Sequence, residues 1–152
     1  MSLRNYTKIR WVVSLLVSGV WAFASSDVRS SETYSVVAHQ DGAPERMSAG
    51  QLKTIFKGQK QRWDDRSKIL LVMLKPSTKG GSGIIEGMFD MDGNALNKYW
   101  LVQVFRGRGT PPKYFSSERV LQTYVAETPG AIGIVTSSSI DPELRSVAID
   151  DR

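Results

Sequence analysis

The sequence contains no cysteine and only one histidine among its 152 residues. Without cysteine, the chain can form no disulfide bond and offers no thiolate to a metal or a substrate. A single histidine excludes the usual zinc sites, which combine several histidine and cysteine ligands. The sequence also gives no support to a Ser-His-Asp triad. Residues 80–84 (GGSGI) lack the final glycine of the G-x-S-x-G nucleophile elbow. The sequence therefore predicts no enzyme, no metal site and no cofactor.

Long apolar runs are also scarce, and the one that is present lies at the N-terminus. Three basic residues precede an apolar stretch over residues 11–23, and Ala22-Phe23-Ala24 forms an A-x-A cleavage site. This pattern predicts a signal peptide over residues 1–24. The apolar stretch is shorter than the roughly 20 residues that span a membrane. We therefore expect an exported chain that keeps no stable membrane span after cleavage.

Excess charge of one sign is small once this segment is set aside. The formal net charge of the whole chain is +5. The expected signal peptide contributes three positive charges and no acidic residue, so the rest of the chain carries about +2. Such a balance gives no support to nucleic-acid binding, which usually shows as a strongly basic patch. Residues 25–33 are polar and are expected to form a flexible leader ahead of one domain over residues 34–152.

Short apolar runs and amphipathic segments alternate along this domain. Runs bounded by turn residues predict four strands, at residues 34–39, 69–74, 131–136 and 145–150. Helical periodicity predicts four helices, which begin at a Ser48/Gln51 capping box, at Ser82, near Ala95, and at Ser116 or Ser117. Strands that alternate with helices favour an α/β domain with a mostly parallel sheet flanked by helices.

The glycine-rich stretch after the second strand holds the pattern of greatest chemical interest. It connects a buried strand to an amphipathic helix, for which Ser82 is the expected N-cap. Glycines allow backbone N–H groups to converge, and the start of a helix leaves its own N–H groups without partners, so a small anion fits there. The simpler interpretation, a tight strand-to-helix connection, stays open. The candidate ligand-binding residues are Thr78, Lys79, Gly80, Gly81, Ser82 and Gly83.

Two charged patterns beside the helix expected over residues 95–106 are interpreted as structural. Residues 90–94 (DMDGN) resemble a calcium loop, but Ala95 stands where an EF-hand needs glycine, so an interhelical turn is expected. Residues 106–109 (RGRG) could attract phosphate, yet a basic last turn followed by a glycine cap explains them more simply. The apolar side chains of this helix are expected to face the core: Leu96, Tyr99, Trp100, Val104 and Phe105.

Three blocks occur in one order along the chain: residues 48–63 (SAGQLKTIFKGQKQRW), the strand with its GGSG segment, and residues 124–135 (YVAETPGAIGIV). Together they resemble the substrate-binding proteins of phosphate ABC transporters, especially their short, single-domain members. Residues 97–112 (NKYWLVQVFRGRGTPP) resemble the short members more than the full-length ones. The resemblance implies a single-lobe, type II periplasmic-binding-protein-like domain, a periplasmic location, and binding of phosphate or a similar oxyanion.

The resemblance also implies particular site residues, and the chain departs from some of them. In full-length members, an arginine and a Ser-Gly-Thr turn grip phosphate. Ser82 and Gly83 match the first two positions of that turn, whereas Ile84 replaces the third. Thr78 stands at the position of the arginine. Lys75 and Lys79 could restore its charge, but an ammonium group cannot form the planar, two-pronged contact of a guanidinium.

Full-length members of this family close two lobes around their ligand, and this chain is about half that long. A single lobe would leave the anion half solvated, so tight capture would need a second copy of the chain or another envelope protein to supply the missing wall. The alternative is an interaction or scaffold module that keeps the fold without the ligand. Trp63 and Tyr114 are the candidate contacts of such a module.

Overall fold

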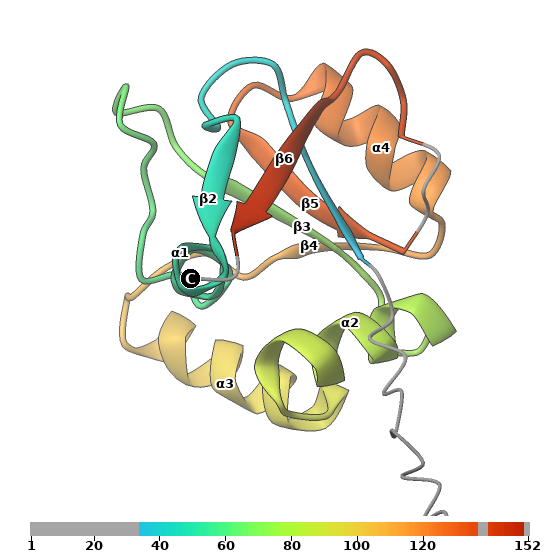
Figure 1. The fold of residues 1–152 in the computed structure, drawn as a ribbon. Coiled ribbons are helices and arrows are strands. Elements are labelled where there is room, and N and C mark those ends of the chain that lie inside the picture. Colours follow the sequence, from blue (N-terminus) through green and yellow to red (C-terminus); the bar gives the residue numbers. More distant parts are fainter. Residues whose placement is uncertain (1–33, 137–139, 151–152) are drawn as a thin grey trace, which may run out of the picture.

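The computed structural model describes residues 34–136 and 140–150, so the predicted signal peptide and leader, residues 1–24 and 25–33, lie outside the described part. Within that part, six strands form one sheet and four helices pack around it (Figure 1). The strands are β1 (Ser35–Ala38), β2 (Arg46–Ser48), β3 (Leu70–Leu74), β4 (Lys113–Phe115), β5 (Ala131–Val135) and β6 (Arg145–Asp150). The helices are α1 (Ala49–Phe56), α2 (Lys79–Phe89), α3 (Gly93–Phe105) and α4 (Glu118–Glu127).

The sheet is mixed, but a single strand runs against the others. Its order is β2-β6-β1-β5-β3-β4. The pairs β2–β6, β3–β5 and β3–β4 are parallel, whereas β1 is antiparallel to both of its neighbours, β5 and β6. The prediction of an α/β domain with a mostly parallel sheet is therefore confirmed.

The strands at the centre of the sheet are apolar along most of their length and are buried. Every residue of β5 is buried, as are the last four of β3 and the last three of β1. Helix α4 packs over these three strands, with Leu121 and Val125 above Gly133. A Cβ at Gly133 would lie 2.9 Å from Leu121 Cδ2, so the missing side chain lets α4 approach β5 closely. Helices α2 and α3 lie side by side at the bottom of Figure 1.

The strong local signals of the sequence are found in the structure. The capping box at the start of α1 is present, with Gln51 N–H donating to Ser48 Oγ at 3.1 Å and Ser48 N–H donating to Gln51 Oε1 at 2.9 Å. Helix α4 starts directly after Ser117, one of the two predicted starts, although the Ser117 side chain makes no capping hydrogen bond. All four predicted strands are present.

Helix α3 differs from its prediction at both ends. It begins at Gly93, because the Asp92 side chain accepts the N–H of Ala95 at 2.7 Å and so caps the helix. At its other end, Val104 and Phe105 were expected to face the core but are 47% and 83% exposed. The helix lies at the edge of the molecule and buries only a narrow stripe, of which Leu96 and Trp100 are the fully buried members.

Candidate anion-binding site

Two helices of the described part begin at one edge of the sheet. Helix α2 follows β3, and α4 follows β4, so both start beside the carboxyl ends of the parallel strands β3, β4 and β5. The N–H of Lys75 donates to the carbonyl of Phe115 at 2.8 Å and ties the ends of β3 and β4 together. Open α/β sheets generally bind their ligands at this edge. The predicted anion site therefore lies where such a fold places a ligand.

The start of α2 corrects the sequence prediction. The helix begins at Lys79, and its N-cap is Thr78 rather than Ser82. The Thr78 hydroxyl oxygen accepts the N–H of Gly81 at 3.0 Å, and the Thr78 carbonyl accepts the N–H of Ser82 at 2.9 Å. Thr78 is the N-cap because its extended backbone and its hydroxyl satisfy the helix start. The stretch that was expected to be a glycine loop is therefore the first turn of the helix.

A glycine is needed in this first turn. A Cβ at Gly81 would overlap the Lys75 carbonyl and lie 2.8 Å from Thr78 Oγ1. A glycine in a helix costs about 1 kcal/mol of stability relative to alanine. Glycine nevertheless stands here because α2 packs closely on the end of β3 and leaves no room for a Cβ. The glycines of the stretch thus serve backbone packing as well as any approach of a ligand.

The six candidate residues differ in whether their N–H groups are already hydrogen-bonded. Lys79 and Gly80 are the first two residues of α2, and their N–H groups have no hydrogen-bond partner within the described part of the chain. Gly81 and Ser82 donate their N–H groups to Thr78, and the Ser82 hydroxyl donates to the Lys79 carbonyl at 3.0 Å. Gly83 lies inside the helix. The open donors at the N-terminus of α2 therefore belong to Lys79 and Gly80, with Thr78 beside them. We call these three residues the mouth of α2.

A carboxylate lies close to this mouth, and sequence reasoning missed it. Glu118 Oε1 accepts the N–H of Thr136 at 2.8 Å and also its hydroxyl hydrogen. Thr136 directly follows β5 and approaches α2, since a Cβ at Gly80 would lie 3.2 Å from Thr136 Cγ2. An acidic residue in the first turn of α4 is stabilised by the helix dipole. The signal in the sequence was a glutamate directly after two serines at a helix start.

A hollow of about 580 Å³ adjoins the residues that lead into α2. Its lining includes the exposed cation Lys75 and the amide side chains of Asn94 and Asn97. The Tyr114 hydroxyl, on another lining residue, has no hydrogen-bond partner within the described part, and burial raises the pKa of the Tyr114 phenol. The lining residues are Lys75, Pro76, Ser77, Gly93, Asn94, Asn97 and Tyr114. This hollow offers hydrogen-bond donors and a positive charge, which suit an oxyanion.

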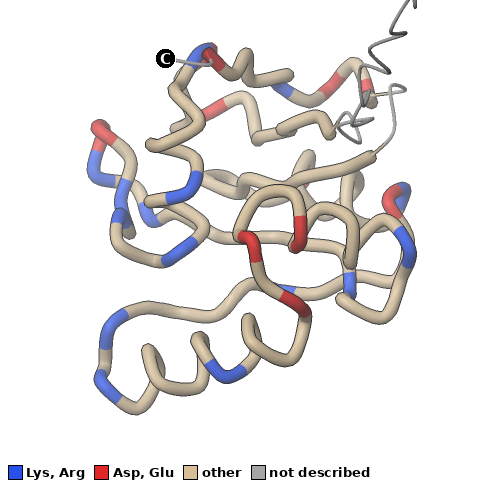
Figure 2. The backbone as a smooth tube through the Cα atoms, turned by 60° about the horizontal axis from the view of Figure 1, so that its bottom comes forward, with Lys and Arg blue, Asp and Glu red and all other residues tan. Residues whose placement is uncertain are grey.

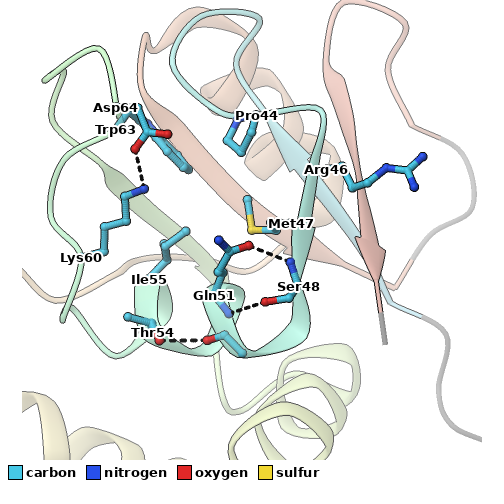
Figure 3. A pocket seen from close by; sticks show the side chains of 11 residues that line it. Pro44, Arg46, Met47, Ser48, Gln51, Thr54, Ile55, Lys60, Trp63 and Asp64 are labelled. Atoms are coloured by element: carbon cyan, nitrogen blue, oxygen red, sulfur yellow. Dashed lines mark hydrogen bonds and ion pairs between the residues drawn. The ribbon is translucent and has the colours of Figure 1, made fainter. Parts of the chain in front are cut away.

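A second hollow, of about 540 Å³, lies beside the start of α1 (Figure 3). Each of its two cationic side chains lies within ion-pair distance of a carboxylate. The guanidinium of Arg46 points away and lies 3.5 Å from Asp150 Oδ1, and Lys60 Nζ is paired with Asp64 Oδ1 at 2.8 Å (Figure 3). Met47, Ile55 and Trp63 add apolar surface. This hollow is therefore less suited to an anion than the mouth of α2.

The two aromatic residues considered as interaction contacts are not exposed. Trp63 is 3% exposed, and its indole N–H donates to the carbonyl of Gly130 at 3.0 Å, so it belongs to the core. Tyr114 is half-buried on β4. His39 accepts the N–H of Asp41 at 3.0 Å within a turn. Among the described residues, no three His, Cys, Asp or Glu side chains gather as metal ligands, and no helix is long and apolar enough to cross a membrane.

Comparison with known proteins gives a likeness in structure only. Neither a family model nor a curated protein matches the chain. Among solved structures, an ABC-type phosphate transport receptor from Vibrio cholerae matches with a TM-score of 0.60 and 17% identity, over 76% of this chain and 45% of that chain. PstS from Borrelia burgdorferi matches with a TM-score of 0.58 and 17% identity, over 77% and 47%.

A third match is a phosphate ABC transporter substrate-binding protein with bound phosphate from Clostridium perfringens, described as putative, with a TM-score of 0.52 and 16% identity, over 78% of this chain and 46% of that chain. The chain thus spans less than half of the length of these neighbours. At such identities the likeness shows the fold alone. This chain is an α/β domain whose fold resembles about half of a phosphate transport receptor.

Proposed function

We propose that the domain is exported and binds a small oxyanion, with phosphate as the first candidate, at the start of α2. The observation that carries the proposal is the pair of unpartnered N–H groups on Lys79 and Gly80, at the sheet edge where open α/β folds bind ligands. Likeness to phosphate receptors supports the choice of phosphate. Export, and with it a periplasmic location, rests on the signal-peptide pattern of residues 1–24.

The exposure of this mouth sets the expected affinity. The two N–H groups, which carry the positive end of the helix dipole, and the ammonium groups of Lys75 and Lys79 each contribute about 1 kcal/mol when solvent surrounds the anion. Their sum, about 4 kcal/mol, corresponds to a dissociation constant near 1 mM. Enclosure would strengthen each contact, because the effective dielectric constant falls. The isolated domain should therefore bind phosphate weakly, and tight binding would require a second chain that covers the mouth.

Two substitutions at one position test the backbone contribution separately from charge. Lys79→Ala removes the ammonium group and keeps the N–H, whereas Lys79→Pro removes both. Proline is accepted at the first position of a helix, and Thr78 already has the extended backbone, with φ −88° and ψ 150°, that precedes a proline. Both variants should fold, which circular dichroism checks.

Calorimetric titration of the chain from Ser25 onward then measures phosphate binding, with sulfate in parallel. We expect Lys79→Ala to weaken phosphate binding about five-fold and Lys79→Pro to weaken it about five-fold more, because each step removes one contact of about 1 kcal/mol. Equal affinities for the two variants would show that the N–H of Lys79 does not contact the anion. Absence of binding by the unchanged chain at concentrations well above about 1 mM would overturn the proposal.

A second candidate function is an interaction or scaffold module that keeps the fold without a ligand. The observation that favours it is the carboxylate of Glu118, which is held close to the mouth of α2 and would repel an anion. This candidate predicts that phosphate changes neither the calorimetric signal nor the amide signals of Lys79 and Gly80. It also predicts that Glu118→Gln does not create phosphate binding.

A further inference from the structure

An exposed apolar surface is concentrated at the end of α3. Four of the five large hydrophobic side chains that are exposed in the described part lie within its last five residues, and we name this group the α3 patch. Single exposed apolar residues are ordinary, but contiguous ones usually mark a contact surface. The α3 patch consists of Leu101, Val102, Val104 and Phe105, which are 58%, 44%, 47% and 83% exposed.

Basic residues surround the α3 patch, and acidic residues are missing from its stretch of chain. Residues 93–117 contain no aspartate or glutamate. Lys98 lies one turn before Leu101, and Arg106 and Arg108 follow Phe105. All three cations are exposed, and none makes an ion pair within the described part. Figure 2 shows basic positions within this helix and beyond its end, with the acidic ones at the other end.

We propose that the α3 patch docks on an anionic lipid surface. Apolar side chains that project from one helix, flanked by long basic side chains, are the features with which a protein lies on such a surface. The apolar groups insert among the acyl chains, while the ammonium and guanidinium groups reach the headgroups. Each basic side chain near an anionic membrane raises binding roughly five-fold, so three of them raise it roughly a hundred-fold.

A second copy of the chain would be a poorer partner for the α3 patch than an anionic lipid surface. If two copies paired their α3 helices in antiparallel directions about the middle of the patch, Arg106 and Arg108 of one copy would lie within about one helical turn of Lys98 of the other. A parallel pairing would place each cation beside its own counterpart. Both arrangements bring like charges together without a balancing carboxylate on residues 93–117. The charge of the patch therefore favours a partner that is negative and apolar together.

The shape of the patch favours lipid over an acidic protein. Phe105, at the very end of the helix, is its most exposed member, and none of the four patch residues lines either of the hollows beside α1 and α2. Protein interfaces usually have packed pockets at their centre, whereas a membrane accepts protruding side chains. This inference does not depend on phosphate binding, and its test uses a different surface of the molecule.

The test is co-sedimentation of the chain from Ser25 onward with lipid vesicles, at about 0.1 M salt so that unspecific attraction is screened. We expect binding to phosphatidylcholine vesicles that hold about 30% phosphatidylglycerol to be at least ten-fold stronger than binding to phosphatidylcholine alone. Phe105→Ser should reduce binding at least ten-fold, and Arg106→Gln about five-fold. Because both side chains are exposed, neither change should unfold the domain.

Matched controls come from α4. Val120 is 54% exposed and Arg119 is also exposed, both outside the patch, so Val120→Ser and Arg119→Gln should leave binding unchanged. A tryptophan placed by Phe105→Trp should be quenched by brominated acyl chains. Failure to sediment with either kind of vesicle would overturn the proposal, as would equal binding to both kinds. Self-association that Phe105→Ser abolishes, or capture of an acidic protein without lipid binding, would also overturn it.

Discussion

The most informative prediction concerns which residue begins α2. Thr78 Oγ1 accepts the N–H of Gly81 at 3.0 Å, so Thr78→Ala removes the cap and should lower the free energy of unfolding by about 1 kcal/mol. Ser82 lies four positions into the helix, and its hydroxyl only donates to the Lys79 carbonyl. Ser82→Ala should therefore leave stability unchanged or raise it by a few tenths of a kcal/mol, since alanine is the better helix former.

Chemical denaturation of the two variants, under one set of conditions, checks the order of their stabilities. In a domain of this size, 1 kcal/mol also shifts the melting temperature by about 4 °C, so thermal unfolding gives a second reading. If Ser82 were the N-cap, as the sequence alone indicates, the order would reverse, and Ser82→Ala would be the costly change. A larger loss for Ser82→Ala than for Thr78→Ala would refute the helix start at Lys79.

Three further predictions follow from the same structure. Gly81→Ala should destabilise the protein by about 2 kcal/mol, because the new Cβ would overlap the Lys75 carbonyl. Gly87→Ala should stabilise it by up to about 1 kcal/mol, because no atom lies within 4 Å of the new Cβ. The denaturant midpoints of this matched pair test both expectations. Burial raises the pKa of Tyr114 in the folded protein, so this side chain ionises at a lower pH in the unfolded chain. Stability should therefore fall as the pH rises from the unfolded pKa toward the folded pKa. Tyr114→Phe should flatten this fall in denaturation curves recorded across alkaline pH. Glu118→Gln should raise phosphate affinity about three-fold in calorimetry, because it removes a negative charge close to the mouth of α2, and an unchanged affinity would place the anion elsewhere.

Elements with strong local signals were predictable from the sequence. Ser48 and Gln51 specify the start of α1 by themselves, and the apolar run of β5 can only be a buried strand or a buried helix segment. The short strands β2 and β4 were not foreseen. Each has three residues, and its pairing depends on β6 or β3, which are distant in sequence, so no local pattern identifies it.

The candidate site was only partly predictable, because it depends on competition between neighbours. Thr78 and Ser82 are both good helix caps by residue type, so their spacing alone does not decide between them. In the structure Thr78 caps α2, and Gly81 packs against the Lys75 carbonyl. The position of Glu118 follows from tertiary contact with Thr136, which no spacing reveals. The exposed end of α3 was missed for a related reason, since periodicity predicts an apolar face but does not show whether another element covers it.

The central claim, that the mouth of α2 receives an oxyanion, is tested most directly by a nitrogen-15 NMR titration with phosphate. The amide signals of Lys79 and Gly80 should move together and furthest, with a midpoint near 1 mM, while those of Gly81 and Ser82, already bonded to Thr78, should move less. Movement centred on Arg106 and Arg108 instead, or no movement well above about 1 mM phosphate, would contradict the claim.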